Sequence, residues 1–462
     1  MKRLMYVLFF VLLTSGMAYA QQAKYVFYFI GDGMGVNQVN GTEMYLAEQE
    51  GRIGVKPLLF TSFPVASMAT TFSATNSVTD SSAAGTALAT GAKTYNGAIG
   101  MDDNKSVLQS VAERAKKSGK KVGVTTSVSV DHATPAAFYA HQPDRGMYYE
   151  IALDLPKAGF DFYAGGGFLK PTTTADKKEA PSIFPIFEEA GYTVARGLDE
   201  YKSKSAQADK MILIQKEGAE PSCLPYAIDR QEGDLTLAEI TESAISFLTK
   251  GSNKGFFLMV EGACIDKQLH SMDWQRAAYD NIEMDKAVGI AQKFAAKNND
   301  TLIIVVADHA HGISISGTYH ELDGKTGREA VRTYADAKWP TFEDRDGDGF
   351  PDNPDPSVTL AVQYANHPDF NCNYKFRDVP MDAAIMGKDG KAIANPKIQG
   401  EFYKGNIPSN DASEVHSADD IVLNAGGPGS EYFKGVMDNT EVFFGMVRAL
   451  GLDGNKTVKS SK

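Results

Sequence analysis

A short segment of small residues surrounds a serine that could act as a nucleophile. Residues 79–87 read Thr-Asp-Ser-Ser-Ala-Ala-Gly-Thr-Ala, and residues 77–91 predict a helix of small residues. The N-terminal dipole of such a helix, together with Asp80, can position the Ser81 hydroxyl and an incoming phosphate group. Helix capping by Asp80 or Ser81 is the structural alternative. Because a serine hydroxyl is a weak nucleophile, the chemical interpretation requires metal ions that activate it.

Two pairs of metal-ligand residues lie far downstream of this serine. Asp308 and His309 combine a carboxylate with an imidazole, a mixture that suits zinc. Asp266 and His270 form a second pair, and their four-residue spacing places both on one side of a helix. Either pair alone is commonly solvated surface, but both follow predicted buried strands. The sequence therefore predicts two zinc sites and indicates a phosphate-transferring metalloenzyme.

Three further residues complete the candidate chemistry. Asp32, between two glycines, is either part of a turn or a carboxylate that bridges two metal ions. Glu261 is either a helix-capping acid or a ligand of a hard cation such as Mg²⁺. Arg145 is either a surface ion-pair partner or a bidentate clamp for phosphate oxygens.

The elements that must position these residues follow an alternating pattern. Four short runs rich in β-forming residues predict buried parallel strands at residues 24–30, 121–126, 256–260 and 301–307. Apolar residues at helical spacing precede three of these strands and predict helices over residues 106–117, 235–250 and 274–297. The fold class is therefore α/β, with a mostly parallel central sheet flanked by helices on both faces.

The predicted strands bring the candidate ligands to one edge of the sheet. The first strand leads into Asp32, the third into Glu261 and Asp266, and the fourth into Asp308 and His309. Sites in open α/β sheets lie beyond the carboxyl ends of the strands. Three separate strands thus deliver ligand types to the same place, which favours a real site over chance occurrence.

Composition and the N-terminus set the broad class of the protein. The 462 residues carry a formal net charge of −12, and no basic stripe indicates nucleic-acid binding. Lys2 and Arg3, an apolar run over residues 4–13 and the small residues at 18–20 predict a secretory signal peptide over residues 1–20, cleaved near Ala20. The alternative is a retained N-terminal anchor. We expect a periplasmic or secreted protein.

The cysteine residues exclude two further classes. An exported product with only Cys223, Cys264 and Cys372 has at most one internal disulfide, so a disulfide scaffold is excluded. Cys223 also begins a Cys-x-Pro sequence, but Ala227 stands where a sulfatase requires arginine.

Two irregular stretches interrupt the predicted core. Residues from about 165 to 226 predict a small elaboration, and residues from about 312 to 413 predict a long insertion near the active-site edge. Within the insertion, acidic residues match the positions of a calcium-binding loop, which predicts a possible Ca²⁺ site at Asp344, Asp346, Asp348, Phe350, Asp352 and Asp355. Prolines nearby argue against flanking EF-hand helices, and a plain acidic turn is the alternative.

Taken together, these motifs resemble the alkaline phosphatase family. The resemblance runs from about residue 29 to residue 452 and rests on motifs that occur in the family's order, at residues 29–34, 79–81, 132–135, 261–267, 308–311 and 414–416. The segment before His416 is longer than compact bacterial members need. The resemblance implies one α/β domain over residues 21–462, with a crown-like or calcium-loop insertion, and often a homodimer.

The resemblance also implies a ligand set. One Zn²⁺ would be held by Asp266, His270 and His416, the other by Asp32, Asp308 and His309, and Mg²⁺ by Asp32, Thr134 and Glu261. Ser81 would attack a phosphomonoester in line and form a phosphoserine, which water activated at the first zinc would hydrolyse. Arg145 would bind the phosphoryl oxygens.

Three positions near these ligands have roles that only the resemblance suggests. His132 would contact the water shell of the third metal or admit zinc there, and Lys267 would bind phosphate through water. His311 resembles a histidine that orients a zinc-binding carboxylate, although a loop histidine is the alternative.

The function predicted from these features is an exported, zinc-dependent phosphomonoesterase of broad substrate range, acting on small phosphomonoesters and releasing inorganic phosphate. One rival is a phosphodiesterase or nucleotide pyrophosphatase, disfavoured by the complete Mg²⁺ site and Arg145. The other is a noncatalytic, calcium-dependent surface protein, disfavoured by the intact ligand set.

Overall fold

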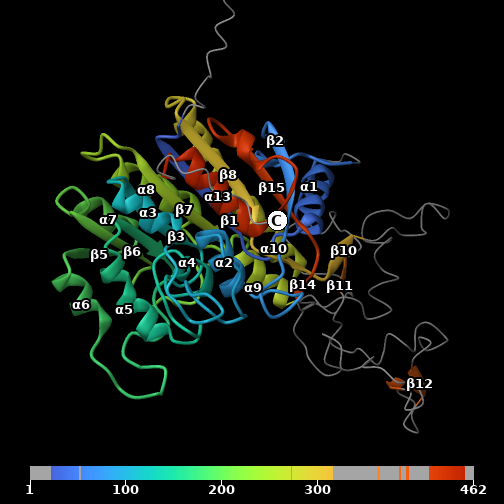
Figure 1. Cartoon of the computed structure of the whole chain (residues 1–462), viewed down its shortest axis with the longest axis horizontal. Helices are drawn as coiled ribbons and strands as arrows, with labels where there is room; N and C mark the ends of the chain where they lie inside the picture. Colours follow the sequence, from blue (N-terminus) through green and yellow to red (C-terminus); the bar gives the residue numbers. More distant parts are fainter. Residues whose placement is uncertain are drawn as a thin grey trace, which may run out of the picture.

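A ten-stranded sheet forms the centre of the computed structural model (Figure 1). The structure describes residues 22–50, 54–271, 273–315 and 416–452, together with three short strands at 362–364, 384–386 and 392–394. The predicted signal peptide, the predicted calcium loop and Cys372 lie outside these residues. None of the helices that are described combines the length and the apolar character needed to cross a membrane.

The middle of the sheet consists of the four strands that the sequence predicted. Their order in space is β8, β1, β7 and β3, all parallel, with bounds Thr301–Ala307, Tyr25–Gly31, Phe256–Gly262 and Lys121–Thr126. Nearly every residue of these strands is buried, as expected for a sheet covered on both faces. The prediction of a mostly parallel α/β sheet is confirmed.

Outer strands extend the sheet on both sides. Beyond β3 lie β4 (Phe162–Gly165), β6 (Lys210–Ile214) and β5 (Tyr192–Arg196), all parallel. Beyond β8 lie β15 (Ile421–Gly426), which is antiparallel to both of its neighbours, then β2 (Val65–Thr70) and β16 (Val436–Asp438).

Helices cover the two faces of the sheet. On one face α10 (Trp274–Ala295) packs on β1, β7 and β8, next to α8 (Leu237–Leu248), α9 (Cys264–His270) and α1 (Val36–Gln49). On the other face lie α2 (Ser81–Thr90), α3 (Val111–Lys117), α4 (Ala133–Ala136) and α13 (Asn439–Ala449).

Successive side chains of β1 point alternately toward the helices on the two faces of the sheet. The Phe27 ring packs edge-on against Phe294 of α10, whereas the next residue, Tyr28, packs against Phe138 just after α4. Successive side chains of a strand point to opposite faces, so a continuous apolar run is needed when both faces are covered.

Two sequence expectations require correction. The helix predicted from residue 106 begins as α3 at Val111, because the Ser110 hydroxyl accepts from the Glu113 N–H and Glu113 reaches back to the Ser110 N–H, which fixes the start. The stretch expected to be irregular at about 165–226 instead holds α6 (Ile183–Glu189), β5, α7 (Leu198–Lys204) and β6, so two sheet strands lie there.

The described part of the insertion forms short strands outside the main sheet. β10 (Ile313–Ile315) pairs with β11 (Val362–Tyr364), and β12 (Ala384–Met386) pairs with β13 (Ala392–Ala394), both antiparallel. β9 (Ala310–His311) pairs with β14 (His416–Ser417), which joins the two ends of the stretch.

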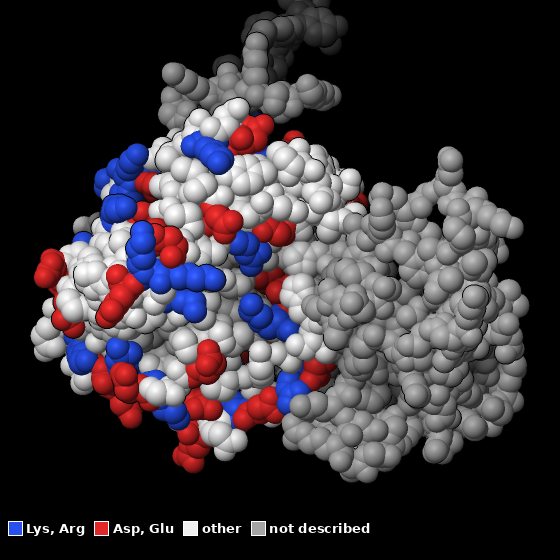
Figure 2. All heavy atoms as spheres, turned by 90° about the horizontal axis from the view of Figure 1, so that it is seen from below, with Lys and Arg blue, Asp and Glu red and all other residues white. Residues whose placement is uncertain are grey.

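The surface carries no large region of one charge on the face that Figure 2 shows. Basic and acidic side chains are interspersed there.

Candidate active site

Carboxyl ends of the central strands deliver the candidate ligands at one level. In the register of the sheet, Gly31 of β1 lies beside Ala307 of β8 and Gly262 of β7. Asp32 and Asp308 therefore emerge side by side, and α9 begins directly after β7. The predicted convergence of three strands is present in the structure.

One cluster, which we call the inner group, consists of Asp32, Asp308 and His309. All three are fully buried, and their ligand atoms lie within 4.8 Å of one another. The His309 Nε2 atom is 3.1 Å from Asp32 Oδ1 and 3.5 Å from Asp308 Oδ2. Gly33 holds Asp308 in place by donating its N–H to Oδ1 at 3.0 Å. With φ of +69°, and with a Cβ that would lie 2.8 Å from His311 Cδ2, position 33 requires glycine.

Ser81 faces the inner group from the start of α2. Its Oγ lies 3.3 Å from His309 Nε2 and 3.5 Å from Asp32 Oδ1. The helix begins here because the Asp80 carboxylate accepts the Ala83 N–H at 2.9 Å. Asp80 thus is the N-cap, and Ser81 is the first helical residue, with its hydroxyl directed at the ligands.

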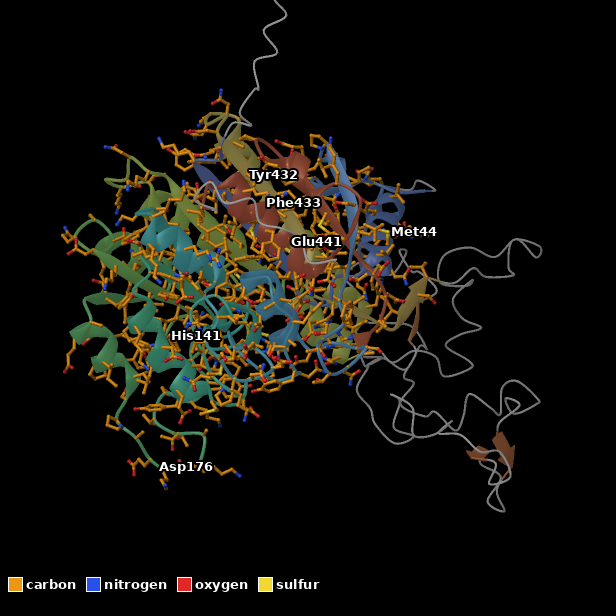
Figure 3. All side chains as sticks on the ribbon, viewed as in Figure 1. Met44, His141, Asp176, Tyr432, Phe433 and Glu441 are labelled. Atoms are coloured by element: carbon orange, nitrogen blue, oxygen red, sulfur yellow. The ribbon has the colours of Figure 1, made fainter. Side chains whose placement is uncertain are left out.

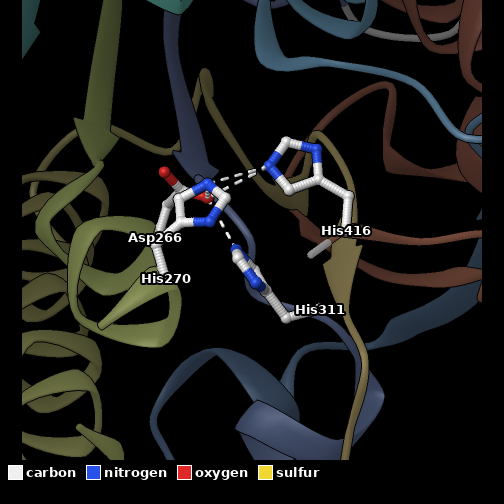
Figure 4. Close-up of side chains that lie close together, drawn as sticks. All are labelled: Asp266, His270, His311 and His416. Carbon is white, nitrogen blue, oxygen red and sulfur yellow. Dashed lines mark hydrogen bonds and ion pairs between the residues drawn. The ribbon is translucent and has the colours of Figure 1, made fainter. Parts of the chain in front are cut away.

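A second cluster, which we call the outer group, consists of Asp266, His270, His311 and His416. The three histidines surround one oxygen of the Asp266 carboxylate (Figure 4). Asp266 Oδ1 lies 2.7 Å from the Nε2 atom of His311, 3.4 Å from that of His270 and 3.5 Å from that of His416. His270 is the most accessible member, with 35% of its side chain exposed.

Pairing of β9 with β14 brings His416 into the outer group. His416 lies opposite His311 in this antiparallel pair. On its other side, His416 Nδ1 lies 2.9 Å from the carbonyl oxygen of Thr79. The segment that carries Ser81 and the outer group are therefore in direct contact.

A hydroxyl from β3's exit loop caps the helix that carries Asp266 and His270. Ser127 Oγ accepts the backbone N–H groups of Ala263 and Cys264 at 2.8 and 3.0 Å. Helix starts leave such N–H groups without partners inside the helix. The loop after β3 therefore fixes the start of α9.

Asp32 also belongs to a third group, together with His132 and Glu261. All three are buried, and the Thr126 hydroxyl donates a short hydrogen bond to Glu261 Oε2. Thr134, a predicted ligand, lies on α4 and is buried, and its hydroxyl finds no hydrogen-bond partner among the described residues.

Charges in the three groups are strongly unbalanced without cations. Burial, followed by the charges of Asp32 and Asp266, raises the pKa of Asp308 well above its ordinary value. Burial, followed by the charge of Asp32, does the same to Glu261. Asp32 Oδ2 and Asp308 Oδ2, both buried, find no hydrogen-bond partner among the described residues. Buried carboxylates with free oxygens fit bound cations, so these residues are suited to hold metal ions.

Asp266 differs because imidazoles surround it. Burial alone would raise its pKa, but the charge of His270 and the hydrogen bonds from His311 and His416 hold it well below the ordinary value. An oxygen that stays anionic amid imidazole nitrogens is typical of a zinc site.

Arg145 reaches the site through Asp80. Its guanidinium donates to Asp80 Oδ2 at 3.1 Å, and its other terminal nitrogen lies 3.5 Å from His132 Nε2. Burial alone would raise the pKa of Asp80, but the charge of Arg145 and hydrogen bonds lower it. Burial, followed by the positive charges of Arg145 and Lys267, lowers the pKa of His132 to about 3. The contacts of Arg145 with Asp80 and His132 place both Arg145 and His132 beside the residue that precedes Ser81.

Comparison with known proteins now identifies the family. A family model described as alkaline phosphatase matches residues 23–161 and 196–452. The chain belongs to the alkaline phosphatase family. Alkaline phosphatase 3 of Bacillus subtilis is 32% identical over 93% of this chain and 89% of its own length. Alkaline phosphatase 4 of Drosophila melanogaster is 29% identical over 93% of this chain and 76% of its own length.

Solved structures agree with this assignment. The alkaline phosphatase of the Antarctic bacterium TAB5 superimposes with a TM-score of 0.67, at 26% identity, covering 94% of this chain and 99% of the other. The Thermus thermophilus alkaline phosphatase gives the same TM-score at 25% identity, covering 94% of this chain and 92% of the other. These relatives are phosphomonoester hydrolases, and the family depends on metal ions.

His311, predicted to orient a zinc-binding carboxylate, has its Nε2 atom 2.7 Å from Asp266 Oδ1 and also lies among the possible ligands. Sequence reasoning missed two residues that support the site. Thr126 and Ser127, which support Glu261 and α9, were not singled out. Their position at the end of a predicted strand was the available signal, since polar residues there face the site.

Proposed function

We propose that this chain is an exported alkaline phosphatase that hydrolyses small phosphomonoesters through a phosphoserine on Ser81. One observation carries the proposal: the Ser81 hydroxyl, at the start of α2, lies within 3.5 Å of both His309 and Asp32 of the inner group. Membership of the family supports the reaction class.

The outer group would hold one Zn²⁺ through Asp266, His270 and His416, with His311 hydrogen-bonded to Asp266. The inner group would hold a second Zn²⁺ next to Ser81. When bound, these ions would lower the pKa of the serine hydroxyl and stabilise the charge that develops on the phosphoryl group.

The third group would hold Mg²⁺ through Asp32, Glu261 and Thr134. Carboxylate and hydroxyl oxygens suit this hard cation, whereas the His132 nitrogen beside them suits zinc. A TAB5 alkaline phosphatase variant in which a histidine is replaced by aspartate has magnesium in its M3 site. That substitution supports the idea that His132 in this chain influences which ion the third group accepts.

Each residue near the phosphate would have a separate role in the reaction. Ser81 Oγ forms a bond to phosphorus on the side opposite the leaving alcohol, whose bond to phosphorus breaks. Arg145, held by Asp80, binds the nonbridging oxygens, and the N-terminal end of α2 favours their negative charge. Water then displaces Ser81 from phosphorus and releases inorganic phosphate. Lys267, on α9, would contact the phosphate through water.

The test uses the mature protein and p-nitrophenyl phosphate at alkaline pH. We expect activity that chelation abolishes and that zinc plus magnesium restores, and an inactive Ser81→Ala variant. Ser77→Ala, four residues upstream and exposed, is the matched control and should keep full activity. Acid-quenched enzyme should carry phosphate on Ser81 by mass spectrometry.

Two results would overturn this proposal. Equal turnover in Ser81→Ala and the parent would exclude Ser81 as the nucleophile. Faster turnover of bis-p-nitrophenyl phosphate than of the monoester would favour a phosphodiesterase.

Export rests on the predicted signal peptide over residues 1–20. We propose a periplasmic or secreted mature protein that begins near Gln21. N-terminal sequencing of the protein recovered outside the cytoplasm tests this, and an intact Met1 would contradict it.

A further inference from the structure

Two of the three cysteine residues meet beside the site without belonging to any ligand group. Cys264, the first residue of α9, is almost fully buried in a small cluster with Val128 and Ala263. Cys223, in the loop after β6, is partly exposed and packs against this cluster together with Tyr226. The proposed reaction uses neither thiol.

Backbone contacts fix the two cysteine residues in place. Cys223 pairs with Val128 in an isolated antiparallel bridge, and the next residue, Leu224, donates its N–H to the Ser127 carbonyl at 2.6 Å. Cys264 Sγ lies 3.3 Å from that same carbonyl oxygen and 3.8 Å from the Leu224 carbonyl oxygen. The Cys264 thiol therefore lies against the segment that carries Cys223, and the Cys223 side chain packs against the cluster that contains Cys264.

We infer that Cys223 and Cys264 form a disulfide bond that holds the start of α9 in the mature protein. The inference goes beyond the proposed function and uses only its expectation of export, because disulfides form and persist in oxidising compartments. Both thiols are free in the structure.

The bond would form by thiol–disulfide exchange with a disulfide oxidant, either a protein or a small molecule. Cys223, the more accessible residue, attacks the oxidant as its thiolate, which yields a mixed disulfide and releases one oxidant thiol. Cys264 then attacks the Cys223 sulfur and releases the second oxidant thiol. The two cysteine residues lose two electrons and two protons, and the oxidant is reduced to two thiols.

The place of the bond gives it a consequence for metal retention. Cys264 lies two residues before Asp266 on the same short helix, so the bond would fix the helix that supplies Asp266 and His270 to the outer group. Cross-linking a loop of roughly 40 residues also reduces the freedom of the unfolded chain and raises the melting temperature, by on the order of 5 °C for a chain of this size.

The experiment exposes the mature, metal-loaded protein to oxidised glutathione or to dithiothreitol, then alkylates free thiols under denaturing conditions and maps peptides without reduction. We expect a Cys223–Cys264 peptide only in the oxidised sample. Cys223→Ser should lack it, whereas Cys372→Ser, which leaves both partners in place, should retain it. Oxidised parent should melt about 5 °C above reduced parent and release metal to a chelator more slowly, and Cys223→Ser should show neither difference.

Three results would overturn the inference. Full alkylation of both Cys223 and Cys264 after oxidation would exclude the bond, as would a peptide linking either one to Cys372. A mapped Cys223–Cys264 bond with unchanged metal release would exclude its role in holding α9. Hydrolysis of p-nitrophenyl phosphate is measured in the same samples, so an active enzyme with free thiols contradicts only the disulfide.

Discussion

The inner and outer groups hold similar ligand types in different surroundings. The side chains of His309 and Asp32 in the inner group are fully buried, whereas those of His270 and His416 in the outer group are 35% and 13% exposed. The inner ligands follow long central strands, and the outer ligands lie on a seven-residue helix and two-residue strands. One fold thus combines a fully buried site at the nucleophile with a more accessible site beside it.

The largest expected effect comes from the inner group. Asp308→Asn keeps an acceptor for the Gly33 N–H but removes an anionic ligand, so we expect activity to fall roughly 10³-fold or more, with loss of one bound ion. Metal analysis and p-nitrophenyl phosphate kinetics measure both. Asp176→Ala, in an exposed loop at the periphery (Figure 3), should leave both unchanged. If Asp308→Asn kept its full metal content, Asp308 would not be needed to hold an ion in the inner group, and the expected difference between the two groups would be contradicted.

A chelator should remove metal from the outer group before it removes metal from the inner group. We expect metal release in at least two phases, with the accessible outer group emptied first and activity lost in that first phase. A chromogenic chelator and parallel activity assays follow the process. Release in a single phase would show that the difference in exposure does not control metal exchange.

A smaller effect is expected for His311. His311→Gln removes the closest imidazole partner of Asp266, and partners of metal ligands typically contribute about 10–100-fold to metal affinity or activity. Titration with zinc should show weaker binding at the outer group and unchanged binding at the inner group. Equal weakening at both groups would show that the two are not independent.

The smallest effect concerns the stability of the metal-free protein at low pH. Burial lowers the pKa of His311 to about 3, below its ordinary value of about 6.5. The unfolded chain therefore binds a proton that the folded chain rejects, so stability present above pH 6.5 is lost as the pH falls below it. Relative to His311→Gln, the parent should lose about 1.4 kcal/mol between pH 7.5 and 5.5. Urea denaturation at the two pH values measures the free energy of unfolding of both proteins. If the difference between the parent and His311→Gln were the same at both pH values, the prediction would be contradicted.

The sequence predicted the centre of the molecule well because strong local patterns coincide with function there. The Thr301–Ala307 strand is apolar at every position after the first and leads directly into Asp308 and His309, so one pattern indicates both the strand and the site. The helix that carries Asp266 and His270 follows from their spacing.

The outer strands escaped prediction because their patterns are weak. β4 has only four residues, and the Tyr192–Arg196 strand lies at the edge of the sheet, with only Tyr192 and Ala195 buried. Short strands are recognised from their pairing partners, which a single sequence does not reveal. The same limit hid the role of Thr126, whose contact with Glu261 depends on the pairing of β3 with β7.

Because β9 pairs with β14, the positions of His311 and His416 do not depend on the length of the chain between them. His311 and His416 are 105 positions apart in sequence, yet they meet across one two-stranded pair. The entropy of closing a loop grows only slowly with its length. Evolution, or a protein engineer, can therefore exchange the intervening segment for a shorter or longer one while both histidines keep their places.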